Sequence, residues 1–390
     1  MKKIRNNVRK IFVFAMALAM LVGITVFTKP LQAQASGRPV KIQSCLISGD
    51  QVVCELKASY VPGGDDGLYY IYANEVNQDG PIGDVVTTVA AGSNATAVFP
   101  LQYNTPASNL SRKFLVAVKQ GGQMVQVSDE HYITNPEAMA GFTTNPIPAG
   151  IKGILPSADF TNGELQELGI QQIVHNMPIE HIVSAEGAPG AVLFAYNGQN
   201  YYFDSAKLQA YDGTIKYFNN QGMKVTMVLL NGGNSEYTKH LIHPSAVGGE
   251  CPGYALNVAD DMAVDHLKAI AAFLGQRYSG ALGYGQVDNW ILGNEVNART
   301  SWWYTNSDSL DFNVGIYAKA FRIFYNELKG MNANVMLYNS IDQEWNRKSN
   351  PGSFLAKDYL DRFNYYMLRE GNIDWGLSFH PYNSPLYDPY

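Results

Sequence analysis

Residues 287–297 read VDNWILGNEVN, a short apolar run of strand length that ends in Gly293, Asn294 and Glu295. A continuous apolar run of this kind is typical of a strand buried on both faces, as in a parallel sheet covered by helices. In an α/β barrel the carboxyl ends of the strands carry the chemistry, so Glu295 stands where a ligand would bind. Glu295 is therefore the first catalytic candidate. The alternative is a carboxylate that caps the strand or pairs with a lysine.

Five other strand-like runs alternate with segments of helical periodicity. They are residues 151–156, 170–178, 224–231, 333–339 and 373–382. This alternation predicts a parallel sheet, which is either open and doubly wound or closed as a TIM-type (β/α)8 barrel. No Gly-rich phosphate motif follows the first strand, so the fold class that we expect is α/β with a TIM-type barrel. Only about six β/α units of that barrel are present.

The preceding part of the chain has a different pattern. Residues 38–135 contain seven short alternating runs separated by Gly and Asp turn signals, which predict a small immunoglobulin-like β-sandwich. Residues 136–149, with three prolines among small and polar residues, predict a linker. Residues 150–390 are then the incomplete barrel. The sandwich either binds carbohydrate or buttresses the barrel, and its sequence leaves both open.

The chain stops at Tyr390, directly after the sixth strand-like run. An eight-stranded barrel without its last two units would leave strand edges unpaired and its core open. We therefore expect the sequence to be a fragment of a longer protein or a prematurely terminated one.

The N-terminus has the three parts of a signal peptide. Five cations lie in residues 1–10, an apolar stretch follows in residues 11–27, and Ala33-Gln34-Ala35 matches the small-x-small cleavage pattern. We expect cleavage after Ala35 and a secreted or cell-surface protein. A retained single-span anchor is the alternative, but the apolar stretch is at the short limit for crossing a bilayer.

Cleavage would also change the charge of the protein. Removing residues 1–35 takes away six of the 28 cations and no acid, which leaves 22 basic and 34 acidic side chains and a formal charge of about −12. Such a charge argues against nucleic acid or an anionic membrane surface as a partner.

Two of the three cysteines lie symmetrically about a turn signal. In CLISGDQVVC, Cys45 and Cys54 would face each other across a hairpin whose turn is Gly49-Asp50, in a pair close enough for a disulfide. A disulfide suits export to an oxidising compartment. Cys251 is left unpaired and is interpreted as incidental.

Two motifs together resemble a known family. WILGNEVN at the fourth strand and SFHPYN at the sixth are similar to the retaining glycoside hydrolases of clan A, which have a (β/α)8 barrel. The resemblance implies a double-displacement hydrolysis of β-linked poly- or oligosaccharide in which Glu295 is the general acid/base. It also implies that Asn294 binds the sugar 2-hydroxyl, that Tyr382 orients the nucleophile, and that His380 lines the same subsite.

The sequence departs from that family at two points. Val296 stands where many members have proline after the Asn-Glu pair, so the turn is less constrained. The nucleophilic glutamate of the clan ends a seventh strand, and none is found here. The truncated chain is accordingly expected to be inactive, and the alternative function is a non-catalytic carbohydrate-binding or cell-surface adhesion protein.

Further side chains are expected at the mouth of the barrel, where the carboxyl ends of its strands meet. His175, Asn231 and Asn339 follow strand-like runs, and their imidazole and amide groups suit neutral sugar hydroxyls. Trp302 and Trp303 are candidate stacking platforms for sugar rings, with loop-anchoring core aromatics as the alternative.

No metal and no cofactor is expected. His240 and His243 have ligand-like spacing, but they lie in a long loop without a helix, an HExxH motif or clustered carboxylates.

Overall fold

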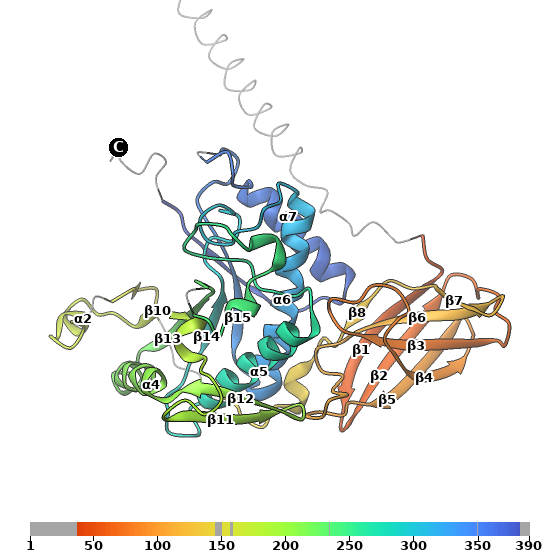
Figure 1. The fold of residues 1–390 in the computed structure, drawn as a ribbon, viewed down its shortest axis with the longest axis horizontal. Coiled ribbons are helices and arrows are strands. Elements are labelled where there is room, and N and C mark those ends of the chain that lie inside the picture. Colours follow the sequence, from red (N-terminus) through yellow and green to blue (C-terminus); the bar gives the residue numbers. More distant parts are fainter. Residues whose placement is uncertain (1–36, 145–149, 157–158, 234, 349, 383–390) are drawn as a thin grey trace, which may run out of the picture. The chain divides into compact units, whose positions relative to one another are not determined.

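The computed structural model describes residues 37–144, 150–156, 159–233, 235–348 and 350–382. Its main sheet is parallel, and its six strands are β9 (Gly153–Ile154), β10 (Gln172–Pro178), β13 (Lys224–Leu230), β14 (Asn289–Leu292), β15 (Met336–Ile341) and β16 (Gly376–Phe379). The order of the strands across the sheet is their order along the chain (Figure 1). A doubly wound sheet would reverse its order at a switch point, whereas this sheet keeps one direction, as a barrel does. The described chain is therefore mixed α/β with a parallel half-barrel sheet.

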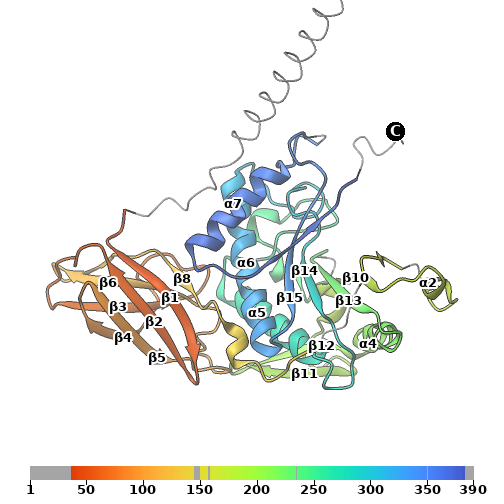
Figure 2. The same cartoon turned by 180° about the vertical axis from the view of Figure 1, so that it is seen from behind.

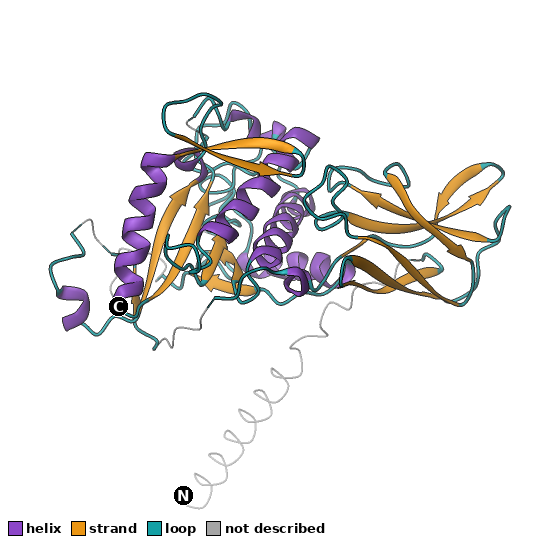
Figure 3. Cartoon of the chain, turned by 90° about the horizontal axis from the view of Figure 1, so that it is seen from below, coloured by secondary structure: helices purple, strands orange, loops and turns teal. Residues whose placement is uncertain are grey.

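Four long helices connect these strands. They are α4 (Ser205–Asn220), α5 (Asp261–Arg277), α6 (Leu310–Met331) and α7 (Ala356–Arg369), and two one-turn helices, α2 (Glu164–Glu167) and α3 (Ile179–Ile182), precede them (Figures 2 and 3). Asp204, Asp260 and Ser309 cap the first three long helices, because each side chain accepts a hydrogen bond from a backbone N–H in the first turn. No helix in the described ranges is both long and apolar enough to cross a membrane. The predicted signal peptide, residues 1–35, lies outside those ranges.

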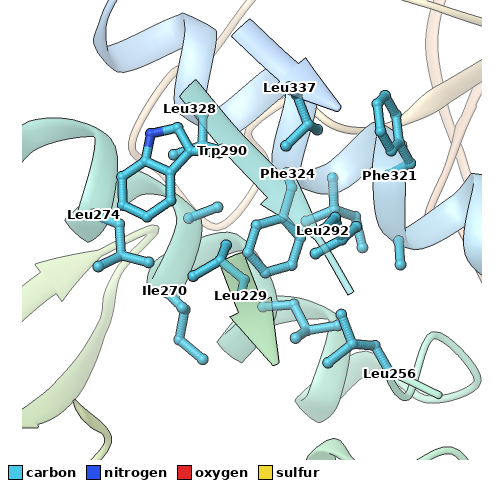
Figure 4. Close-up of a cluster of buried hydrophobic side chains, with 14 of the residues drawn as sticks. Leu229, Leu256, Ile270, Leu274, Trp290, Leu292, Phe321, Phe324, Leu328 and Leu337 are labelled. Carbon is cyan, nitrogen blue, oxygen red and sulfur yellow. The ribbon is translucent and has the colours of Figure 1, made fainter. Parts of the chain in front are cut away.

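The two faces of the parallel sheet have different surroundings. Met227, Trp290 and Leu337 stand side by side on adjacent strands and are buried against the helices. Figure 4 shows Trp290 and Leu337 among buried side chains of α5 and α6. Successive side chains of a strand point to opposite faces, so Ile291 and Tyr338 belong to the inner face of the half-barrel. This alternation decides which strand residues can reach the site.

A hairpin that the sequence analysis did not predict lies between β10 and α4. It pairs β11 (Ala191–Tyr196) with β12 (Gln199–Asp204) through a two-residue turn at Asn197 and Gly198. Both turn residues have positive φ, 48° and 78°, which is the requirement of a type I′ turn. The Asn-Gly pair between apolar runs is the signal that would have predicted this hairpin.

The first third of the described chain forms two antiparallel sheets. One has the order β1 (Val40–Ser48), β2 (Gln51–Ala58), β5 (Asn94–Pro100), and the other has the order β4 (Asp84–Ala90), β3 (Leu68–Asn74), β6 (Lys113–Gln120), β7 (Gln123–Gln126), with β8 (His131–Tyr132) also paired to β6. Each of the seven predicted runs contains a strand. Buried residues of both sheets, among them Ile42, Leu56, Ile71 and Val116, belong to one hydrophobic cluster. The immunoglobulin-like topology stays a prediction.

The two hairpin cysteines are placed as the sequence predicts but are not bonded. Cys45 lies directly opposite Cys54 in the β1–β2 register, and both are fully buried. Both are free thiols in the structure, so the predicted disulfide is not formed there. Burial raises the pKa of the Cys45 thiol, and the neighbouring Cys54 adds to this effect.

The predicted linker is partly packed. It begins with the 3-10 helix η1 (Pro136–Met139), and the backbone N–H of Phe142 donates to the carbonyl of Met331 at the end of α6, at 3.1 Å. The N–H of Thr144 donates to Asn332 Oδ1 at 2.9 Å. Residues 136–144 are therefore attached to α6, and residues 145–149 lie outside the described ranges.

Glu327 of α6 makes buried hydrogen bonds with the segment before β6 and with β11. Its carboxylate accepts a hydrogen bond from the Ser111 hydroxyl at 2.7 Å and another from the Tyr196 hydroxyl. Close by, Lys268 of α5 donates to Glu75 at 2.6 Å. Burial raises the pKa of Glu327 to about 7. The folded protein therefore holds this proton more tightly than the unfolded chain does.

This pKa predicts how Glu327→Gln changes the pH dependence of folding. The folded-state pKa lies above the value of about 4.3 for a free glutamate, so the contribution of Glu327 to stability falls as pH rises from about 4.3 to 7. Glutamine removes this loss, and the variant should gain roughly 3 kcal/mol relative to the wild type between pH 5 and pH 8. Urea unfolding of both proteins at the two pH values measures the difference. The assigned pKa would be contradicted if the difference in unfolding free energy between the wild type and the variant did not change with pH.

Candidate functional site

Glu295 lies just beyond the carboxyl end of β14 and bonds to a histidine from the edge strand. Its Oε1 lies 2.8 Å from His380 Nδ1. The backbone N–H of Glu295 donates to Ser340 Oγ at 3.1 Å, and Ser340 Oγ also lies 3.5 Å from His380 Nε2. Both side chains of the pair are mostly buried, with 17% of Glu295 and 24% of His380 exposed. The structure thus brings together two of the predicted site residues and adds Ser340.

The three groups form a closed ring of hydrogen bonds. Ser340 Oγ accepts from the Glu295 N–H, so its own proton is free to point at His380 Nε2. His380 Nδ1 then carries the imidazole proton and donates it to Glu295 Oε1. Within the described part of the chain, Glu295 Oε2 has no hydrogen-bond partner. The ring fixes the carboxyl group through one oxygen and leaves the other available for a ligand.

Glu295 holds an unusual backbone conformation. Its φ is 44°, in the left-handed region that L residues with a Cβ adopt at a cost of about 1–2 kcal/mol. Gly293, two residues earlier, has a φ of 73°. Strained backbone of this kind persists where the surrounding structure holds it, and it gathers at functional sites.

The strain can be measured with two variants that both lack the carboxylate. Glu295→Gly should be more stable than Glu295→Ala by about 1 kcal/mol, because glycine alone tolerates this φ without a Cβ clash. Chemical denaturation of the two variants gives the difference. An alanine variant as stable as the glycine variant would show that the backbone relaxes and is not held.

A second polar group lies next to Glu295. Buried Asn297 donates from Nδ2 to Asp342 Oδ1 at 2.7 Å and accepts from the Asp342 backbone N–H at 3.0 Å. Burial raises the pKa of Asp342, and the charges of Glu344 and Glu295 raise it further. Asp342 therefore senses the charge of Glu295, but its Oδ1 already accepts from Asn297 and from the Glu344 N–H. Asn297 and Ser340 were missed by the sequence analysis.

Three other predicted residues remain candidates. Asn294 is half-buried beside Glu295, and its side chain makes no hydrogen bond with the described residues. Tyr382 is 54% exposed, with its ring 6.2 Å from that of His380. Trp302 is half-buried in the loop after Glu295.

Two predicted strand residues point away from the inner face. His175 shares a face with buried Ile173 and Met177, and its ring contacts Tyr211 of α4 with centroids 6.1 Å apart. Asn339 is fully buried on the face that carries Leu337. Both stay predictions, although side chains alternate along a strand and these two belong to the face that packs on the helices.

Two loop residues also have structural roles. Asn231 donates from Nδ2 to the carbonyls of Leu241 and Tyr254, at 3.2 and 3.4 Å, and so holds the loop after β13. Trp303 is 2% exposed and packs edge-on against Tyr317 of α6, with centroids 5.1 Å apart. Substrate contact stays a prediction for both, although the burial of Trp303 favours the core alternative for that residue.

The two loop histidines have separate partners. His240 Nε2 lies 2.8 Å from His266 Nδ1, whereas His243 Nδ1 accepts from the Ser245 backbone N–H at 3.1 Å. Among the described residues no group of three or more His, Cys, Asp or Glu side chains could hold a metal ion.

Residues 144–390 match the model of a family described as "Family of unknown function (DUF5722)", which is more than half of the chain. The chain belongs to this family. The matched region includes Glu295, Ser340 and His380, so the whole hydrogen-bonded ring lies in the DUF5722 part. No curated protein matches the chain.

Several solved structures are similar to this DUF5722 chain. A structure of two fungal β-1,4-galactanases is 13% identical over 57% of this chain and 60% of that chain, with a TM-score of 0.33. A glucosidase from Croceicoccus marinus is 13% identical over 62% and 44%, with a TM-score of 0.33. A β-glucuronidase from Bacteroides uniformis is 12% identical over 88% and 36%, with a TM-score of 0.28. The chain spans 60% or less of the length of each of these three.

Proposed function

We propose that this protein is an exported O-glycosyl hydrolase that cleaves β-linked poly- or oligosaccharide with retention of configuration. The observation that carries the proposal is the ring of hydrogen bonds around Glu295, whose side chain is mostly buried just beyond the carboxyl end of β14. A positioned carboxylic acid with one free oxygen is the group that protonates a glycosidic oxygen.

Each neighbouring residue has a role in this proposal. Glu295 gives its proton to the leaving oxygen and later removes a proton from the attacking water. His380 and Ser340 hold the carboxyl group in place. Asn294 binds the sugar 2-hydroxyl, and Tyr382 offers its hydroxyl to the nucleophile and an exposed ring to the ligand.

The nucleophile is proposed to be a glutamate at the end of a seventh strand. In retaining enzymes the two carboxyl groups lie about 5–5.5 Å apart. Among residues 37–382, apart from the few undescribed positions, the parallel sheet has six strands. Asp342 is a poor candidate, because Asn297 and the Glu344 N–H both hold its Oδ1.

The second candidate function is carbohydrate binding or cell-surface adhesion without turnover. The hydrogen bonds that hold Asp342 Oδ1 favour this second function, since they leave this nearby carboxylate poorly placed to act as a nucleophile. Both functions predict that sugar binds at Glu295, and they differ in bond cleavage.

Hydrolysis assays separate the two functions. The reading frame beyond codon 390 is sequenced, and a polypeptide continued through strands seven and eight is tested on 4-nitrophenyl β-glycosides and on β-1,4-linked disaccharides. The hydrolase predicts release of nitrophenol that depends on both Glu295 and the strand-seven glutamate. Binding of these sugars without any release would favour the adhesion protein.

Export and the disulfide are proposed together. The signal-peptide pattern of residues 1–35 would deliver the hairpin of Cys45 and Cys54 to an oxidising compartment, where opposed thiols can pair. Mass spectrometry without reduction should find the 45–54 peptides linked in exported protein. Two free thiols in that material would contradict the disulfide, and an uncleaved N-terminus would contradict removal after Ala35.

The antiparallel sheets are proposed to be immunoglobulin-like.

A further inference from the structure

A cavity of about 430 Å³ lies between the loop after β3 and the exposed surface of α6 and α7. Asn77 and Asp79 line it from the loop, Glu130 lines it from the segment before β8, and His243 closes another side. None of the residues of the Glu295 ring lines it. Its volume is within the range of small-molecule sites.

Three polar side chains line this cavity, and each has a polar atom that makes no hydrogen bond with the described residues. The Lys319 ammonium has its nearest carboxylate, that of Asp79, at 4.0 Å. Among the described residues the side chain of Glu370 makes no hydrogen bond or close ion pair, although the charge of Arg322 acts on its carboxyl group. His243 is 8% exposed, and because its Nδ1 accepts from Ser245, its Nε2 carries the proton of the neutral ring. The His243 ring is buried while Lys319 and Glu370 are partly exposed, so the cavity offers two donors and one carboxyl group to a ligand that enters it.

One face of α6 supplies the floor. Phe312, Gly315, Ile316 and Lys319 follow the i, i+3, i+4, i+7 spacing of a helix face, and all four line the cavity. Phe312 is 41% exposed, and its ring meets that of His243 edge-on at 5.8 Å. An exposed aromatic ring beside hydrogen-bonding groups suits a ligand with both an apolar face and hydroxyls.

The charges around the cavity disfavour an anionic ligand. Its carboxylates, from Asp79, Glu130, Asp311 and Glu370, outnumber the cations Lys319 and Arg369. Burial raises the pKa of Glu370 to about 7, so near neutral pH this group can accept or donate a hydrogen bond. A ligand hydroxyl can do both as well, and it carries no charge that the carboxylates would repel.

We propose that this cavity is a second binding site, which takes a neutral polyhydroxylated ligand of monosaccharide to disaccharide size. Lys319 and the His243 Nε2–H donate to ligand oxygens, Glu370 accepts from a hydroxyl, and Phe312 contacts the apolar face of the ring. The site is separate from the Glu295 ring, and its occupation does not depend on turnover there.

The test measures binding of D-glucose, D-galactose and cellobiose to the full chain by saturation-transfer NMR and calorimetry. At least one sugar should bind with a Kd of roughly 1–10 mM. Phe312→Ala and Lys319→Met should each weaken that binding by about tenfold. Tyr60→Ala and Lys207→Met, which change an aromatic residue and a lysine exposed elsewhere, are the matched controls and should leave the Kd unchanged.

Gly315→Ala separates a binding loss caused by a change in the cavity from a binding loss caused by misfolding. A Cβ at this position would lie 3.3 Å from the Tyr366 hydroxyl oxygen and would narrow the cavity, while alanine favours the helix. We expect weaker sugar binding with unchanged or higher stability.

The proposal is overturned if no sugar binds up to roughly 50 mM, well above the expected Kd. It is also overturned if Glu295→Gln and His380→Ala abolish all sugar binding while Phe312→Ala and Gly315→Ala leave it intact, since the sugar then sits at the Glu295 ring alone.

Discussion

Replacing Glu295 with glutamine should lower the hydrolysis of an unactivated β-glycoside by about 100-fold to 10,000-fold, the contribution of a positioned proton donor. Glutamine keeps the size of the side chain and can still bond to His380, but it cannot give a proton to the leaving oxygen. The measurement is the initial rate on a β-1,4-linked disaccharide, made on a polypeptide that continues through strands seven and eight.

The leaving group provides an internal control. With a dinitrophenyl glycoside, departure needs little acid assistance, so the glycosyl-enzyme intermediate should form at a nearly normal rate in Glu295→Gln. Glu167→Gln, an exposed carboxylate on α2, is the matched control variant and should keep full activity. If Glu295→Gln keeps full activity on the disaccharide, Glu295 is a structural carboxylate.

Replacing Trp290 with alanine should destabilise the fold by about 3–5 kcal/mol, the usual cost of truncating a large buried aromatic side chain. Trp290 is 1% exposed in the middle of β14, between Met227 and Leu337 of the neighbouring strands (Figure 4). The cavity left behind would lie between the sheet and α5 and α6, where close packing lets the structure relax only partly.

Trp345→Ala is the matched control for Trp290→Ala. Trp345 is 43% exposed and has one aromatic neighbour, Phe379, at 6.0 Å. Its loss should cost less than about 1 kcal/mol. Guanidinium unfolding of both variants measures the two values. Equal losses would contradict the assignment of Trp290 to the core between sheet and helices.

The sequence predicts the parallel sheet and the position of Glu295 because both depend on local pattern. Apolar runs with helices between them require a covered parallel sheet, and a residue that ends such a run lies at its carboxyl edge. His380 follows the same rule, and the structure places it beside Glu295. The bond between them joins residues 85 positions apart, so it depends on the order of strands, which the local pattern does not contain.

The expected and the observed placement of side chains differ where the direction of a side chain matters. His175 and Asn339 were placed at the mouth by sequence position alone, although a shift of one residue along a strand reverses the face. Counting alternate residues back from buried Ile341 would have put Asn339 among the packed side chains and Ser340 on the inner face. For Trp303 the sequence left a stacking platform and a core aromatic both open, because its burial depends on contact with Tyr317 of the following helix.

Azide rescue of Glu295→Ala tests whether Glu295 is the general acid/base of a retaining glycosidase. The small variant leaves room for azide at the position of the missing carboxylate, where the anion can attack the glycosyl-enzyme intermediate without base assistance. We expect azide to restore turnover of a dinitrophenyl β-glycoside, and we expect NMR of the product to show the β-glycosyl azide. An α-glycosyl azide would contradict the retaining mechanism. Full turnover by the variant without azide would contradict the assignment of Glu295 as the general acid/base.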